Sequence, residues 1–286
     1  MDFNTYLNNA WNDHAHDANA VAHNFGQGLT LAQTTDQLSQ LARLGTHVYS
    51  EHLGRWNDGI IFLNQIKTQT SYSAESTGSQ MKIYEASLAL SSQPNTKISS
   101  FTVSEQIRIL GMSASAMSEQ GQPEKAKSYF LKALDLAKSG LEATDPANRS
   151  LAITGNNLAT SLEEKKERTP QETELMILSA QIGRQFWEIA GTWKETERAE
   201  YRLSKTYLQA SNYDKSFSHA RNCIEICEKN GAPAIEFFFG YEAIALAERA
   251  RGQKVRYEFA VGQMKKYLNE VPENEKPWCQ SALEKI

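Results

Sequence analysis

Apolar residues recur at three- and four-residue intervals along nearly the whole chain, and almost no segment alternates apolar and polar residues over the length of a strand. The sequence therefore predicts an all-α fold. Five of the seven prolines fall at breaks between the helical runs, where a missing N–H is tolerated at a helix start. About thirteen helices are predicted, over residues 3–24, 34–53, 56–70, 77–91, 102–120, 122–143, 147–167, 170–190, 193–210, 212–230, 233–251, 253–270 and 275–285.

The loops between these helices are mostly two to five residues long, so successive helices are expected to fold back as antiparallel hairpins. One exception is the Ser/Thr-rich segment SSQPNTKISS over residues 91–100, which we interpret as the internal joint. Residues 68–79 form a second loose stretch. We therefore expect one domain of helical hairpins over residues 1–92 and a second helical domain over residues 101–286.

Small and apolar residues recur at intervals of five, four and three where the helices of a hairpin must cross closely. The best sets are Gly121, Ala126, Phe130 and Ala133; Ser211, Ser216, Ala220 and Cys223; and Gly252, Tyr257, Val261 and Met264. A weaker set is Gly54, Gly59, Leu63 and Ile66. The recurrence predicts an internal repeat of helical hairpins.

These intervals resemble the tetratricopeptide repeat, most clearly in LKALDLAK at 131–138 and YLQASNYDKSFSHARNCIEI at 207–226. The units are longer than that repeat's roughly 34 residues, and in this they resemble kinesin light chains and bacterial peptide-sensing regulators. GNNLATSLEE at 155–164 is similar to a stretch of the former. The resemblance implies a right-handed α-solenoid of about six antiparallel hairpins, with residues 1–92 as divergent repeat or cap and residues 101–286 as a superhelix ending in a capping helix.

The composition restricts the kinds of partner and the cellular compartment that the chain can have. Hydrophobic residues make up 40% and charged residues 22%, as in folded globular proteins. The net charge of -4 argues against nucleic acid as the main partner, and no basic recognition helix precedes residue 100. The three cysteines are too few and odd in number for a disulfide framework, which indicates a reducing compartment. With neither a signal peptide nor a membrane-length apolar run, we expect a cytoplasmic protein without a membrane partner.

Five of the six histidines lie in the first 52 residues, close to several carboxylates. A metal site needs three or four ligands converging on one point. At 100° per residue, His14 and His52 lie in the apolar stripes of their helices, whereas His47 and Glu51 face outward. In a simple hairpin His52 lies about 12 Å beyond the level of His14. We therefore predict that His14 and His52 pack between helices and that the chain binds neither a metal nor a cofactor. The alternative is a metal or catalytic site.

Other candidate chemistry is sparse. Cys223 and Cys227 share a helical face and could form a metal or redox pair, but Cys223 occupies a crossing position, so packing is expected for both. The chain has no glycine-rich phosphate loop, nucleophile elbow or zinc-knuckle spacing. The charged run EEKKER at 163–168 is expected to be solvated. No catalytic residue is predicted.

In stacked hairpins the first helix of each pair lines the concave surface. Aligning the units places six candidate peptide-binding residues there, namely Asn156, Asn157, Arg198, Tyr201, Arg202 and Lys205. Three of them, Asn157, Arg198 and Arg202, are similar to the residues with which co-chaperone repeat domains grip a terminal carboxylate, although Gly111 and Ser115 stand where that clamp has a Lys and an Asn. The alternative is a surface whose cations are neutralised by Glu195, Glu197 and Glu200.

The sequence therefore predicts a non-enzymatic scaffold that binds an acidic or carboxylate-ended peptide in a basic concave groove. A second hypothesis is a regulator without its own DNA-binding domain, in which a peptide or small molecule closes the two halves about residues 91–100. A third is a metal-dependent enzyme that uses the histidine-rich amino-terminal helices. Those helices could also serve as the contact of a homodimer.

Overall fold

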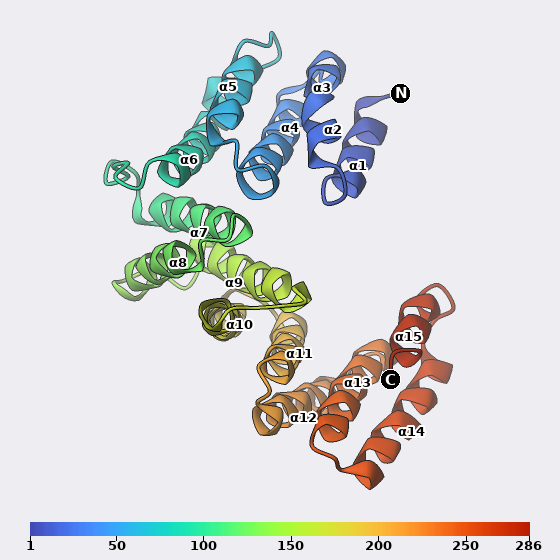
Figure 1. Cartoon of the computed structure of the whole chain (residues 1–286). Coiled ribbons are helices and arrows are strands. Elements are labelled where there is room, and N and C mark those ends of the chain that lie inside the picture. Colours follow the sequence, from blue (N-terminus) through green and yellow to red (C-terminus); the bar gives the residue numbers. More distant parts are fainter. The chain divides into compact units, whose positions relative to one another are not determined.

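The computed structural model describes residues 1–286 and contains fifteen α-helices, one π-helix and no strand, which confirms the all-α prediction (Figure 1). The first helices are α1 (Phe3–Asp13), α2 (Ala18–His23), α3 (Phe25–Leu31), α4 (Thr35–His47), the π-helix η1 (Val48–His52), α5 (Trp56–Lys67), α6 (Ala74–Ser92), α7 (Val103–Glu119) and α8 (Pro123–Lys138). The others are α9 (Pro146–Glu164), α10 (Pro170–Ala190), α11 (Trp193–Gln209), α12 (Tyr213–Asn230), α13 (Ala234–Ala250), α14 (Lys254–Glu270) and α15 (Lys276–Leu283). None of these helices combines the length and apolar character needed to cross a membrane.

The helices form two compact units, Met1–Leu141 and Glu142–Ile286. The first unit contains α1 to α8 with η1, and the second contains α9 to α15. The expected joint at residues 91–100 lies inside the first unit, where α6 and α7, on either side of it, pack against each other.

Successive helices pack as antiparallel pairs, with α7 against α8 in the first unit and α9 against α10, α11 against α12 and α13 against α14 in the second (Figure 1). The paired helices are consistent with the predicted helical repeat. Six crossing positions of the repeat have no exposed surface, namely Ala126, Phe130, Ala133, Ser216, Ala220 and Cys223. Five of these side chains are small and allow the paired helices to approach closely, which is consistent with the repeat predicted from the sequence.

The same type of turn joins the two helices within three of the pairs, α7–α8, α11–α12 and α13–α14. Gly121, Ser211 and Gly252 each adopt a left-handed conformation, with φ of 67°, 57° and 72°. The residue that follows each of them donates its amide hydrogen to a carbonyl five residues back, at N–O distances of 2.8, 2.8 and 2.9 Å. This hydrogen bond is that of a Schellman motif, which ends one helix and redirects the chain into the next.

The amino-terminal segment differs from the prediction. The expected helix over residues 3–24 is broken, because α1 ends at Asp13 and the side chain of Asp17 starts α2 by accepting a hydrogen bond from the amide of Ala20 at 2.9 Å. A further helix, α3, forms where a turn was expected. The expected helix over residues 34–53 ends in the π-helix η1, in which the amide of Leu53 donates to the carbonyl of Val48 at 3.0 Å.

Candidate functional site

Helix α11 holds four of the six predicted peptide-binding residues and has a central place in the second unit. It packs against its neighbours α10 and α12, and also against α9 and α13, which are not adjacent to it in sequence. Arg198, Tyr201, Arg202 and Lys205 each contact a glutamate on α9 or α13. We call these four side chains the α11 ridge.

Arg198 is held by a buried carboxylate of α13. Its Nη2 lies 2.7 Å from Oε1 of Glu236 and its Nε lies 3.3 Å from Oε2. The Arg198 side chain is 61% exposed and that of Glu236 only 4%. Lys194 shares the carboxylate, with its Nζ 3.3 Å from Oε1. The hydrogen bond to Glu236 also raises the pKa of Arg198, so this guanidinium is a fixed cation at the surface.

Tyr201 and Lys205 share a second buried carboxylate. The Tyr201 hydroxyl donates to Oε2 of Glu242 at 2.5 Å, and Nζ of Lys205 lies 3.6 Å from Oε1. The same ammonium lies 5.6 Å from the centre of the Tyr201 ring. Burial, followed by the charge of Glu242, raises the pKa of Tyr201 well above its usual value. The phenol therefore remains a hydrogen-bond donor at neutral pH.

Arg202 connects α11 to α9 through Glu163, with Nη1 3.0 Å from Oε2. Burial raises the pKa of Glu163, although the charge of Arg202 opposes this shift. The Nε atom of Arg202 is buried and has no hydrogen-bond partner. Asn156 and Asn157 lie on α9 with Glu163; Asn156 is half-buried and Asn157 is exposed.

The carboxylates that neutralise the ridge are not those expected from sequence proximity. Glu195 instead caps α11, accepting a hydrogen bond from the amide of Thr192 at 2.8 Å. Glu200 accepts hydrogen bonds from Arg184 at 2.6 Å, from His219 at 2.7 Å and from Asn222 at 3.1 Å, on α10 and α12. Burial alone would raise the pKa of Glu200, but these three bonds lower it overall. Glu200 thus ties α11 to the helices on its other side.

Glu197 is a buried acid, although the sequence suggested it only as a surface partner of the cations. It is 1% exposed, and burial followed by the charge of Glu236 raises its pKa to about 8. At neutral pH its carboxyl group is mostly protonated. No sequence signal indicates the pair, because Glu236 is 39 positions further along, on α13.

The charged run at 163–168 is not simply solvated, which corrects that prediction. Besides the contact of Glu163 with Arg202, Nζ of Lys165 lies 2.7 Å from Oε1 of Glu172. The Nη1 atom of Arg168 donates to the carbonyls of Leu162, Glu163 and Lys165 at 2.9, 3.0 and 2.7 Å. These bonds satisfy carbonyls at the end of α9 that have no partner within the helix.

Cys223 and Cys227 are free thiols in the core with no exposed surface. Burial raises the pKa of both, that of Cys227 to about 12, so neither forms a reactive thiolate at neutral pH. This agrees with the packing role expected from the sequence.

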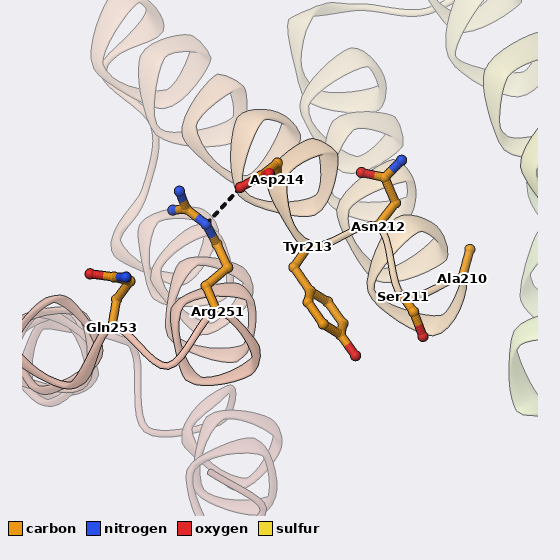
Figure 2. A pocket seen from close by; sticks show the side chains of 7 residues that line it. All are labelled: Ala210, Ser211, Asn212, Tyr213, Asp214, Arg251 and Gln253. Atoms are coloured by element: carbon orange, nitrogen blue, oxygen red, sulfur yellow. Dashed lines mark hydrogen bonds and ion pairs between the residues drawn. The ribbon is translucent and has the colours of Figure 1, made fainter.

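A surface hollow of about 550 Å³ lies between the α11–α12 and α13–α14 turns, and Figure 2 shows its lining of Ala210, Ser211, Asn212, Tyr213, Asp214, Arg251 and Gln253. Arg251 is its only cation. Its Nε lies 3.0 Å from Oδ1 of Asp214, and its Nη1 lies 2.9 Å from Oε2 of Glu248. One cation here faces two carboxylates, whereas the four cations on α11 share three carboxylates, so the hollow is a weaker candidate for an acidic ligand than the α11 ridge.

The histidines of the first unit do not lie as predicted. The ligand nitrogens of His14, His47 and His52 all lie within 4.8 Å of one another, so the expectation that these residues are separated is wrong. Burial, followed by the charges of His47 and His14, lowers the pKa of His52 to about 4. Burial alone would lower the pKa of His47, but its hydrogen bond to Glu51 raises it overall.

Comparison of the sequence with models of protein families and with curated proteins finds no match.

Proposed function

We propose that this chain is a tetratricopeptide-like helical-repeat protein, a right-handed α-solenoid that acts as a non-enzymatic scaffold and binds an acidic or carboxylate-ended peptide along the α11 ridge. The observation that supports this most directly is the pairing of each ridge residue with a glutamate from α9 or α13. The proposed setting is the cytoplasm, which the three buried free thiols favour.

The glutamates orient the ridge before a ligand arrives. A long cationic side chain loses rotamer freedom when it binds, and a side chain that is already fixed loses less. Arg198 uses Nε and Nη2 on Glu236, which leaves the hydrogens of Nη1 for a ligand. A planar guanidinium in this position can donate to a carboxylate with defined geometry, which a lysine ammonium cannot do.

The charge around the ridge favours an acidic ligand. Lys194, Arg198, Arg202 and Lys205 contact three carboxylates, those of Glu163, Glu236 and Glu242. The carboxylates are the more buried partners, with side-chain exposures of 9%, 4% and 9%, whereas Lys194 and Arg198 are 44% and 61% exposed. A ligand on this face therefore meets cationic groups first.

The two asparagines of α9 have a complementary role in the proposal. The exposed amide of Asn157 can donate to and accept from the backbone of an extended peptide. Asn156 is half-buried and lies one helical turn before Thr160, whose hydroxyl donates to the backbone carbonyl of Asn156 at 2.8 Å. The asparagines would thus fix the peptide backbone while the ridge binds its acidic groups.

The test is a titration of the purified chain with a fluorescent decapeptide rich in Asp and Glu that ends in a free carboxylate. We expect Arg198→Gln to weaken binding at least about tenfold, because an interfacial charged hydrogen bond is worth roughly 1.5–3 kcal/mol. Asn157→Ala should weaken it about two- to tenfold, because a neutral hydrogen bond is worth roughly 0.5–1.5 kcal/mol. Arg221→Gln is the matched control, since Arg221 is 60% exposed and also pairs with a glutamate, but lies on α12. Equal affinities for the wild type and the Arg198 variant would contradict the proposal.

A further inference from the structure

Three histidines converge in the first unit at the junction of α1, α4 and η1. Their ring centres form a nearly equilateral triangle, with 5.0 Å between His14 and His47, 4.9 Å between His14 and His52 and 4.9 Å between His47 and His52. All three residues are half-buried. The Nε2 atoms of His47 and His52 are 3.2 Å apart.

The π-helix produces this convergence. Residues 47 and 52 are five positions apart, which on a regular α-helix separates their directions by about 140°. In η1 the backbone hydrogen bonds join positions i and i+5, so residues separated by five positions share one face of the helix. His14, the residue directly after α1, completes the cluster, with its ring against those of His47 and His52. Single π-turns are rare and occur often at functional sites.

The Nδ1 contacts of His14 and His47 leave their Nε2 lone pairs for a metal, which would replace the hydrogen bond between the Nε2 atoms of His47 and His52. Nδ1 of His14 lies 2.5 Å from the carbonyl oxygen of Trp11, and Nδ1 of His47 lies 3.0 Å from Oε1 of Glu51. A neutral imidazole that donates from Nδ1 has a free lone pair on Nε2. Contacts to a backbone carbonyl and to a carboxylate are those that orient metal-bound histidines in proteins.

We propose that His14, His47 and His52 bind one divalent first-row transition-metal ion, Zn²⁺ foremost, through their Nε2 atoms. This site is independent of the peptide-binding function proposed for the second unit. Imidazole ligands suit zinc, copper, iron and nickel rather than magnesium or calcium. Zn–N bonds of about 2.0–2.1 Å in a tetrahedral site place the ligand nitrogens roughly 3.3 Å apart, close to the 3.2 Å between His47 and His52.

The remaining adjustment is small. The ligand nitrogens lie within 4.8 Å of one another, so closing the triangle to roughly 3.3 Å requires side-chain shifts of about 1.5 Å at most. The charged groups that act most strongly on His47 are Glu51 and Glu119, which are acidic, and Arg43, which is basic. Two carboxylates against one guanidinium favour a divalent cation. Three protein ligands leave the fourth tetrahedral position for water or an external ligand.

The experiment uses the full chain, freed of any affinity tag and stripped of metal with a chelator. Competition with a chromophoric zinc indicator gives stoichiometry and affinity, and titration with Co²⁺ reports the geometry through its visible absorption. We expect one equivalent of Zn²⁺ and the intense bands of tetrahedral Co²⁺. Less than half an equivalent at 100 µM Zn²⁺, or only the weak absorption of octahedral Co²⁺, would overturn the proposal.

Variants identify the ligands. His14→Asn and His52→Asn are each expected to weaken Zn²⁺ binding at least about 100-fold, because each removes a ligand. Glu51→Gln is expected to weaken it about 10- to 100-fold with unchanged stoichiometry, as for other groups that orient a ligand. The matched control is His16→Asn, an exposed histidine two positions from His14, which should stay within about twofold of the wild type. Equal losses in the His14 and His16 variants would refute the assignment.

Zinc-dependent stability provides a second readout. Zn²⁺ at 100 times its dissociation constant should raise the free energy of unfolding of the wild type by about 2.7 kcal/mol and leave that of His52→Asn unchanged. Circular dichroism confirms that the variants are folded. If His52→Asn does not fold, the stoichiometry and the Co²⁺ spectrum of the wild type decide whether the chain has this metal site. An equal zinc effect on wild type and a folded variant would refute the site.

Discussion

Gly155 of α9 and Gly183 of α10 bring the backbones of the two helices into direct contact. A Cβ atom on Gly155 would lie 2.7 Å from the amide nitrogen of Gly183 and 2.6 Å from the carbonyl oxygen of Ser179. A Cβ atom on Gly183 would lie 3.1 Å from the amide nitrogen of Asn156. The α9–α10 pair therefore depends on glycine at its crossing point, next to the asparagines of the proposed peptide site.

Gly155→Ala is expected to destabilise the chain by about 1–3 kcal/mol, because the added methyl group meets backbone atoms that cannot move aside easily. The control is Gly262→Ala on α14, where a Cβ atom has no neighbour within 4 Å. There the higher helix propensity of alanine should stabilise the chain by about 0.5–1 kcal/mol. Urea denaturation distinguishes the two, and stabilisation by both substitutions would mean that α9 and α10 do not cross at Gly155.

Glu197 predicts a pH dependence of stability. Its pKa is raised from 4.5 to about 8 in the folded chain, so the folded state binds a proton more tightly than the unfolded state. The free energy of unfolding should therefore fall as pH rises from about 4.5 to about 8. Glu197→Gln removes this loss while keeping a donor toward Glu236. We expect it to stabilise the chain at pH 8.5 by on the order of 1–3 kcal/mol relative to its effect at pH 5.

Urea denaturation at the two pH values measures this difference. Glu225→Gln is the control, because Glu225 is 59% exposed on α12 and should show little pH-dependent effect. If the free energy of unfolding depends on pH equally in the wild type and in Glu197→Gln, the Glu197 carboxyl group is ionised in the folded chain at both pH values, which would contradict the prediction.

The left-handed backbone of Ser211 at a hairpin turn makes this position a candidate for a stabilising substitution. It has φ of 57°, where Gly121 and Gly252 occupy the equivalent turns. The left-handed conformation costs a residue with a Cβ atom about 1 kcal/mol or more. Ser211→Gly should therefore raise the free energy of unfolding by about 0.5–1 kcal/mol, and Gly252→Ser should lower it by a similar amount. Thermal denaturation of both variants checks this, and shifts of the same sign would contradict an equivalent turn.

Local patterns in the sequence predict much of this fold. The spacing from Gly121 to Ala133 locates both the left-handed turn and the buried crossing positions, because a hairpin with a short loop fixes both within a few residues. The break between α1 and α2 was missed. There a local cap, the side chain of Asp17 on the amide of Ala20, outweighs the apolar period that runs through the segment.

The candidate sites were harder to predict, for two different reasons. The histidine cluster was missed because a wheel at 100° per residue assumes an α-helix, and η1 departs from that angle between His47 and His52. Placing Arg198 and Arg202 on one face needed only helical periodicity. Their partners Glu236 and Glu163 are 38 and 39 positions away, and only the packing of α11 against α13 and α9 brings them together.

The most direct measurement for the peptide-binding function compares two forms of one acidic decapeptide, with a free terminal carboxylate and with an amidated end, by fluorescence anisotropy against the wild-type chain. We expect the free acid to bind at least about tenfold more tightly, because its carboxylate can accept charge-assisted hydrogen bonds from Arg198. Its affinity should also fall as salt is raised. Equal binding of the two forms would contradict recognition of the terminal carboxylate at the α11 ridge, and no binding of either at millimolar concentration would contradict the proposed peptide-binding function.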